Sequence, residues 1–268
     1  MAVLDTEELR IKVQQMYRLV AEQPAATYHF DMGRELATRL GYPGELLDSI
    51  PDAAVESFAG VGYFFDLARL QEGERVLDLG SGSGMDAFLA ARLVGTVGHV
   101  IGVDFTVEQL DKARRLAAEG TFEQVEFLAG RIERLPADDE SVDCAISNGV
   151  INLSPDKPRV FAEAARVLRP GGRLAIADIV TERQLSDAIV GNADLWASCI
   201  GGAAQRDVYV EAVDSAGLRV EHIRQNPYEF ISGKARSASA TYGVTSISLL
   251  AVKPGRSQVR TPAIGRVR

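Results

Sequence analysis

The sequence predicts an α/β fold in which helices cover both faces of a mostly parallel sheet. Three observations lead to this prediction. Strand patterns alternate with helix patterns through the middle of the chain, a glycine-rich turn follows the first of these strands, and an aspartate ends the next one. Strands that alternate with helices form right-handed βαβ units and therefore parallel sheets. Such sheets bind ligands at the carboxyl ends of their strands.

The first strand and its turn carry the strongest signal. Residues 76–84 read VLDLGSGSG, in which apolar side chains suited to a strand buried on both faces precede three alternating glycines. Glycine lets the backbone turn sharply and approach a ligand without a clash from Cβ. Residues 85–94 have the apolar spacing of a helix, so free N–H groups of its first turn face the loop.

The spacing of these glycines distinguishes two classes of cofactor. Nicotinamide and flavin sites use G-x-G-x-x-G, with an acidic residue about 20 positions further on. Here the third glycine comes one residue early, Met85 occupies the place of a Gly or Ala, and Asp78 lies two residues before the first glycine. These departures favour S-adenosylmethionine (SAM). The next strand ends at Asp104, whose carboxylate can accept both ribose hydroxyl protons; a solvated strand end is the alternative.

The remaining elements continue the alternation. Strands are expected at residues 75–79, 100–104, 125–129, 142–147, 173–178, 218–225 and 244–252. Helices are expected at residues 86–94, 107–118, 158–168 and 208–216. Two earlier helices, at 7–23 and 34–40, precede a turn at 41–44.

The length of the chain predicts a single enzyme domain that carries extra elements, since 268 residues can bury a large core and still leave accessory segments. We expect a helical lid over residues 1–72 that covers the substrate. A cofactor-binding domain follows over 73–253, with an insertion at 179–206. Residues 254–268 combine arginines with Ser, Pro and Gly and are expected to be a disordered tail; binding of an acidic partner is the alternative.

Charge, hydropathy and cysteine content argue against several classes of protein and of binding site. A net charge of −8 without a basic stripe argues against a nucleic-acid partner. No apolar run approaches the roughly 18 residues of a membrane span, and residues 1–10 are unlike a signal peptide, so we expect a cytoplasmic protein. Cys144 and Cys199 form no disulfide framework and, without clustered histidines, no metal site. Cys144 lies in an apolar strand, where a small buried side chain is expected. Monomer and homodimer both remain open.

Several motifs make the chain resemble the class I SAM-dependent methyltransferases over roughly residues 70 to 255. They are residues 76–84, 103–104, 131–136 (RIERLP) and 167–174 (VLRPGGRL). The resemblance implies a Rossmann-like, doubly wound, seven-stranded sheet whose last strand is antiparallel. Within that superfamily the chain is similar to the arsenite methyltransferase branch. This similarity is carried by residues 147–157 (SNGVINLSPDK), 177–180 (ADIV) and 195–202 (LWASCIGG), and by the segments 40–43 and 58–62.

The chain departs from that branch at the cysteine positions that bind arsenic. The branch binds trivalent arsenic through three thiolates, and the resemblance places these positions at Val61, Gly149 and Cys199. Only the last is a cysteine. Because arsenic is thiophilic, a site left with one sulfur ligand loses most of its coordination, and we expect no efficient arsenite methylation. Arsenite methylation with a reduced thiol set remains an alternative, as does a SAM-binding protein without catalysis.

The cofactor residues follow partly from the strand ends and partly from the resemblance. The methionine end of SAM is expected at Asp78, Gly80, Ser81, Gly82 and Gly84. The ribose and the adenine are expected at Asp104, Phe105, Gly130, Arg131 and Ile132. After the fourth strand, the resemblance adds Asn148, Gly149 and Val150. Asn148 either contacts the amino-acid part of SAM or caps its own loop.

The acceptor side is less well defined by the sequence. Methyl transfer depends mainly on positioning, although a hydroxyl or protonated amine acceptor also needs a base. His29, in the predicted lid, is the best candidate base, with a surface or core role as the alternative. Cys199 is a candidate nucleophile or substrate-contacting thiol, or else a small packing residue. Tyr63, Asn152 and Trp196 are expected to line a pocket for a small-molecule acceptor, and S-adenosylhomocysteine (SAH) is the expected product.

Overall fold

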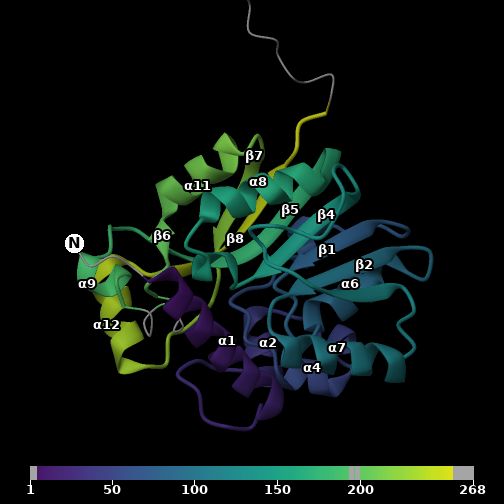
Figure 1. Ribbon diagram of the computed structural model, residues 1–268, viewed down its shortest axis with the longest axis horizontal. Coiled ribbons are helices and arrows are strands. Elements are labelled where there is room, and N and C mark those ends of the chain that lie inside the picture. Colours follow the sequence, from purple (N-terminus) through teal and green to yellow (C-terminus); the bar gives the residue numbers. More distant parts are fainter. Residues whose placement is uncertain (1–4, 193–195, 197–199, 256–268) are drawn as a thin grey trace, which may run out of the picture.

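The computed structural model describes residues 5–192, 196 and 200–255. Its centre is one sheet with the strand order β3-β2-β1-β4-β5-β8-β7, and a short β6 pairs with β5 (Figure 1). Neighbours from β3 to β5 are parallel, whereas β8 runs antiparallel to both β5 and β7. The strands are β1 (Arg75–Leu79), β2 (His99–Asp104), β3 (Val125–Ala129), β4 (Val142–Asn148), β5 (Leu168–Thr181), β6 (Ala204–Gln205), β7 (Arg219–Gln225) and β8 (Thr245–Val252).

This topology confirms the predicted Rossmann-like sheet with an antiparallel last strand, to which β6 adds a two-residue eighth strand. The bounds of β1 and β3 are those predicted. The largest difference is β5, which begins five residues before the expected Arg173. Pairing lengthens it: Leu168 lies opposite Val142, and the N–H of Gly171 donates to the carbonyl of Lys253 at 2.8 Å.

Helices cover the sheet in two layers. Figure 1 shows α8 and α11 on one side and α6, α7 and the N-terminal helices on the other. Alternate strand side chains supply the two cores: Val76 packs with the α6 and α7 layer, and Leu77 and Leu79 pack with the α8 and α11 layer. The N-terminal and first-layer helices are α1 (Thr6–Glu22), α2 (Gly33–Leu40), α3 (Gly44–Leu47), α4 (Asp52–Glu56), α5 (Phe65–Ala68), α6 (Met85–Val94) and α7 (Val107–Glu119). The later helices are η1 (Ile151–Leu153), α8 (Lys157–Val167), α9 (Asp187–Val190), α11 (Arg206–Ser215) and α12 (Gly233–Tyr242).

One long helix was not predicted. α12 has the sequence GKARSASATY, whose small and polar residues show no helical apolar stripe. The side chain of Ser232 caps it by accepting the N–H of Ala235 at 3.1 Å. Two predictions, the substrate role of Cys199 and the tail beyond Gly255, fall outside the described residues. Within them, no helix combines the length and the apolar character that crossing a bilayer requires.

Candidate active site

A cavity of about 310 Å³ lies where the carboxyl ends of β1, β2, β3 and β4 meet. Eleven of the thirteen predicted cofactor residues line it: Asp78, Gly80, Ser81, Gly82, Asp104, Phe105, Gly130, Arg131, Ile132, Asn148 and Val150. Gly84 and Gly149 do not. The fold therefore brings the four predicted strand-end segments together around one space.

The glycines of the loop after β1 have different structural roles. All three have backbone angles in the left-handed region, with φ of +75° at Gly80, +52° at Gly82 and +93° at Gly84. A Cβ on Gly80 would lie 2.5 Å from the Val150 side chain, and one on Gly84 would lie 2.7 Å from the Phe127 ring. The nearest atom to a Cβ on Gly82 would be 3.7 Å away. Gly80 and Gly84 therefore permit close packing, whereas Gly82 is required for its backbone conformation, since a Cβ there would make only ordinary van der Waals contact.

Asp104 joins the two loops that follow β1 and β2. Its Oδ2 accepts the N–H of Gly82 at 2.9 Å, and its Oδ1 accepts the N–H of Thr106 at 2.8 Å. Burial raises the pKa of this carboxyl group, although these hydrogen bonds oppose the rise. Each carboxylate oxygen has a second lone pair, so Asp104 can still accept hydrogen bonds from ribose hydroxyls.

Asp78 and Ser81 carry polar atoms that the protein does not satisfy. Asp78 is 2% exposed and lines the cavity, yet its Oδ2 has no hydrogen-bond partner. The Oγ of Ser81, in the same wall, also has none. Buried polar atoms in proteins are almost always paired, so these two are suited to meet polar groups of a ligand.

Asn148, Asp86 and Tyr42 form a buried hydrogen-bond network beside the cavity. The hydroxyl of Tyr42 donates to Asp86 Oδ1 at 2.7 Å, and Asn148 Nδ2 donates to Asp86 Oδ2 at 2.9 Å. Asn148 Oδ1 accepts the N–H groups of Val61 at 2.7 Å and Gly62 at 3.3 Å. The Asn148 amide thus holds the N-terminal segment against the end of β4. Sequence reasoning assigned no role to Tyr42 or Asp86, because only the fold brings them to Asn148.

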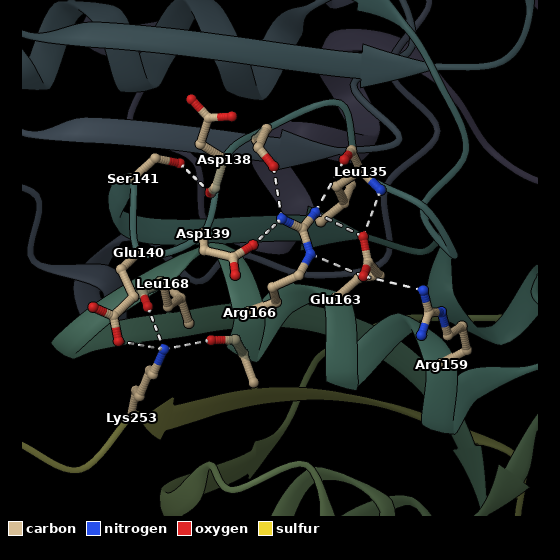
Figure 2. A network of polar contacts seen from close by, with 12 residues as sticks. Leu135, Asp138, Asp139, Glu140, Ser141, Arg159, Glu163, Arg166, Leu168 and Lys253 are labelled. Carbon is tan, nitrogen blue, oxygen red and sulfur yellow. Dashed lines mark hydrogen bonds and ion pairs between the residues drawn. The ribbon is translucent and has the colours of Figure 1, made fainter.

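Side chains of α8 hold the loop after β3 in place through hydrogen bonds and ion pairs (Figure 2). Glu163 Oε2 accepts the N–H of Leu135 at 2.9 Å and the Nη2 of Arg166 at 2.8 Å. Arg166 also donates to the carbonyls of Leu135 at 3.1 Å and Ala137 at 2.8 Å. This network holds in place the loop whose first residues, Gly130 to Ile132, line the cavity.

Helix α1 forms one wall of the cavity, with Leu9, Val13 and Tyr17 among its lining residues. A hydrogen-bond chain connects this wall to the glycine-rich loop. Ser83 Oγ donates to Gln109 Oε1 at 2.5 Å, and Gln109 Nε2 donates to the carbonyl of Tyr17 at 2.8 Å. One buried amide on α7 therefore contacts both sides of the cavity.

Of the candidate acceptor residues, the four that the structure describes, His29, Tyr63, Asn152 and Trp196, do not line this cavity. His29 packs edge-on against Phe30, with ring centroids 4.6 Å apart. Tyr63 packs against Tyr42 at 4.9 Å, and Trp196 donates from Nε1 to the carbonyl of Val190 at 2.6 Å. Asn152 is fully buried. Their roles stay predictions.

The fold brings two of the three thiol positions of the resembled branch together. Val61 is 1% exposed, and a Cβ on Gly149 would lie 3.2 Å from Val61 Cγ1. Gly149 has a φ of +70°, in the left-handed region that favours glycine. Cys144 is fully buried as expected, and burial raises the pKa of its thiol to about 12.

Known proteins resemble this chain in sequence and in structure. Residues 70–226 match the family described as methyltransferase domain. The arsenite methyltransferase of Halobacterium salinarum is 43% identical over 220 residues, which cover 81% of this chain and 56% of that protein. The human arsenite methyltransferase is 42% identical over 184 residues, 62% of this chain and 49% of that protein. The chain thus spans about half the length of these curated relatives.

Among solved structures, the arsenic(III) SAM methyltransferase of Chlamydomonas reinhardtii matches with a TM-score of 0.61 and 31% identity, over 84% of this chain and 74% of that one. A geranyl diphosphate C-methyltransferase from Streptomyces coelicolor matches with a TM-score of 0.63 but 19% identity, over 90% of this chain and 98% of that one, which shows the fold alone.

The cavity residues fit SAM, the cofactor that this family implies. Asp78 Oδ2 and Ser81 Oγ offer unsatisfied polar atoms, Gly82 lines the cavity, and Asp104 retains accepting capacity. The chain belongs to the methyltransferase-domain family, as a class I SAM-dependent member that resembles the arsenite methyltransferases.

Proposed function

We propose that this chain transfers the methyl group of SAM to an uncharged small-molecule acceptor other than arsenite, with SAH as product. The cavity carries the proposal, because Asp78, with its unsatisfied Oδ2, and apolar residues from the N-terminal segment line the same space. SAM supplies a methyl group that its sulfonium already makes electrophilic. The chain's own contribution is to bind and orient, which can lower a barrier by roughly 7 to 11 kcal/mol.

Different cavity residues serve different parts of the cofactor in this proposal. Asp78 and Ser81 hold the polar methionine end. Asp104 accepts hydrogen bonds from the ribose hydroxyls, while Phe105 and Ile132 contact the adenine. Support comes from the fact that all five residues line one cavity.

The exclusion of arsenite rests on the side chains that replace thiols. Val61 and Gly149 offer no sulfur where two ligands of the resembled branch would lie. Cys144 does not compensate, because it is fully buried and its raised pKa keeps it a thiol at neutral pH. Phe58 and Leu153 in the cavity lining add apolar surface, which favours an uncharged acceptor.

Binding and turnover test this proposal separately. Titration calorimetry on the full chain is expected to show SAM and SAH binding, and Asp104→Ala is expected to weaken SAM affinity about 10- to 100-fold, through loss of charge-assisted hydrogen bonds. Asp111→Ala, at an exposed carboxylate on α7, is the matched control and is expected to leave affinity unchanged. Formation of SAH with a panel of uncharged acceptors then measures turnover. Binding without turnover of any acceptor would favour a non-catalytic SAM-binding protein.

Arsenite is the second candidate acceptor, because relatives 43% and 42% identical to this chain are arsenite methyltransferases. We expect no arsenite-dependent SAH formation, and no effect of Cys199→Ser on turnover of other acceptors. The double variant Val61→Cys/Gly149→Cys restores both thiol positions and is expected to gain arsenite binding at a cost in stability, since the smaller residue at 61 makes room at 149 but the φ of +70° there disfavours a side chain. Arsenite-dependent turnover that disappears in Cys199→Ser would establish arsenite as the acceptor instead.

The proposal includes the N-terminal segment, residues 1–72, as a lid. Two observations support this role: residues of α1 line the cavity, and Gln109 on α7 donates a hydrogen bond to the carbonyl of Tyr17 on α1. Gln109→Ala is expected to speed amide hydrogen exchange in α1 and to speed release of SAH, whereas Gln71→Ala, at an exposed site, is expected to change neither. If SAM binding leaves exchange in α1 unchanged, the lid role is wrong.

A further inference from the structure

The loop that follows β4 forms part of the cavity wall. Val150, Leu153, Ser154 and Pro155 all line the cavity. Leu153 and Pro155 are apolar and so add to the surface that an uncharged acceptor requires. The contacts that fix the position of this loop therefore bear on how an acceptor is held.

Lys157, the first residue of α8, contacts this loop with its ammonium group. Its side chain is half-buried, and its Nζ donates to the carbonyl of Asn152 at 3.2 Å and to the carbonyl of Ser154 at 3.0 Å. These carbonyls lie at the end of η1, where a helix leaves acceptors without partners in the helix. One ammonium group thus satisfies two backbone acceptors of the loop.

Two further contacts anchor the loop to other elements. The Oγ of Ser154 donates to Glu133 Oε1 at 2.6 Å, in the loop after β3. The N–H of Asn152 donates to Asp178 on β5, whose Oδ2 also accepts the hydroxyl of Tyr209 at 2.7 Å. The loop after β4 is therefore held from α8, from β5 and from the loop after β3.

The indole of Trp196 lies over the same ammonium group. The Nζ of Lys157 is 5.1 Å from the centroid of the indole, within the range of a cation–π interaction. Trp196 is 5% exposed, and its Nε1 donates to the carbonyl of Val190. A Cβ on Gly202 would clash with the carbonyl oxygen of Asn152 and would lie 2.5 Å from the indole. The segment after β5 therefore packs directly on the loop that Lys157 holds.

We propose that Lys157 is a positioning residue for the acceptor, whose ammonium group holds the loop of residues 152–155 and the Trp196 indole together and so sets the apolar wall against which the acceptor lies. This inference rests on the proposed function, because it concerns the acceptor side of the same cavity. Lys157 does not itself line the cavity, so it acts through the loop. The proposed contacts to SAM come from other segments, so SAM affinity does not depend on Lys157.

The charge of Lys157 can be followed by spectroscopy. Burial lowers its pKa to about 8, although the charge of Asp178 opposes this effect. The pKa of Asp178 is about 6, and that of Tyr209 is well above its usual range, so neither group changes its charge near pH 8. The sequence contains one tryptophan, so tryptophan emission reports on the indole beside Lys157 alone.

A pH titration of tryptophan emission on the full chain tests the contact. Wild type is expected to show a transition with its midpoint near pH 8, where the ammonium group loses its proton. Lys157→Met is expected to show none. Lys157→Arg keeps a permanent charge over the indole and is expected to stay at the wild-type emission of the protonated form. Lys12→Met, at a lysine paired with Glu8 on α1, is the matched control and is expected to titrate like wild type.

Steady-state kinetics and hydrogen exchange test the positioning role. With the uncharged acceptor of the panel that gives SAH fastest, Lys157→Met is expected to raise the acceptor KM about tenfold, because two carbonyls of the loop lose their donor. SAM affinity is expected to stay within about twofold of wild type. Lys157→Arg is expected to recover most of the loss. Amide exchange in residues 151–154 is expected to be faster in Lys157→Met and unchanged in Lys12→Met.

The outcomes separate this inference from the proposed function. An emission transition that persists in Lys157→Met, or an unchanged acceptor KM in that variant, would overturn the role of Lys157 and leave the proposed function intact. SAM binding by wild type without turnover of any acceptor would overturn the proposed function, and the positioning role with it. If Lys157→Met fails to fold, a Lys157→Arg variant that still titrates near pH 8 like wild type would overturn the inference.

Discussion

Tyr42 connects the N-terminal segment to the ends of β4 and α6 through its hydroxyl. It is 3% exposed, its hydroxyl donates to Asp86, and that hydroxyl also accepts from Asn148 Nδ2 at 2.9 Å. Its ring packs edge-on against Phe58 and Tyr63. One residue thus combines an aromatic contact with a hydrogen bond to a buried carboxyl.

Tyr42→Phe is expected to lower the free energy of unfolding by about 1 to 3 kcal/mol, because it leaves Asp86 Oδ1 buried without its donor. Urea unfolding measures this change. Tyr63→Phe keeps the ring that packs on Tyr42 and serves as the matched control, with an expected loss below about 0.5 kcal/mol. Equal losses in the two variants would show that the hydroxyl of Tyr42 contributes nothing specific.

At the scale of elements, the position of the loop after β3 depends on α8. Glu163 is 4% exposed, and its carboxylate is satisfied by Arg166 and by the N–H of Leu135. Hydrogen bonding to Arg166 lowers the pKa of Glu163 despite its burial. Arg166 also donates to Asp139 Oδ1 at 2.7 Å (Figure 2), so one side chain connects the helix to three residues of the loop, Leu135, Ala137 and Asp139.

Arg166→Ala is expected to destabilise the protein by about 2 to 4 kcal/mol, because it leaves the buried Glu163 carboxylate without its main partner. SAM affinity is expected to fall as well, since the same loop begins with Gly130 to Ile132 of the cavity wall. Arg169→Ala removes an exposed pair with Asp143 and is expected to cost less than about 1 kcal/mol. Chemical denaturation of both variants provides the comparison, and similar losses would refute the role given to Arg166.

At the scale of the whole molecule, buried carboxyls with raised pKa values control how stability depends on pH. Besides Asp86, burial raises the pKa of Asp178 to about 6, where Tyr209 donates to Asp178 Oδ2 at 2.7 Å. The folded state then binds more protons than the unfolded state above about pH 4. Stability from these groups is fully present below the unfolded pKa and is lost as the pH rises through about 6.

The ligand-free protein is therefore expected to lose about 2 to 3 kcal/mol of unfolding free energy between pH 5 and pH 7. Urea unfolding at several pH values measures the slope. A stability that rises from pH 5 to pH 7 in the ligand-free protein would contradict the assignment of these raised pKa values.

Local sequence patterns were sufficient for the sheet and for most of the residues that line the cavity. The bounds of β1 and β3 follow from short runs rich in apolar residues, and the loop after β1 follows from its alternating glycines. Asp78 and Asp104 were expected to lie near each other because parallel strands bring their carboxyl ends to one edge, and both line the cavity. By contrast, α12 was missed because packing and a serine cap, rather than an apolar stripe, support it.

The sequence by itself determined the Rossmann-like class and the residues at the strand ends, because strand periodicity and turn chemistry act over a few neighbouring residues. Only the tertiary structure decided which distant side chains meet. It joined Asn148 to Tyr42, which is 106 positions away in the chain, placed Val61 against Gly149, and made α1 a wall of the cavity while His29 and Trp196 lie outside it. These contacts depend on how the helices pack against the sheet. That packing is set by the combined shape of many side chains that are far apart in the sequence, so no short segment encodes it.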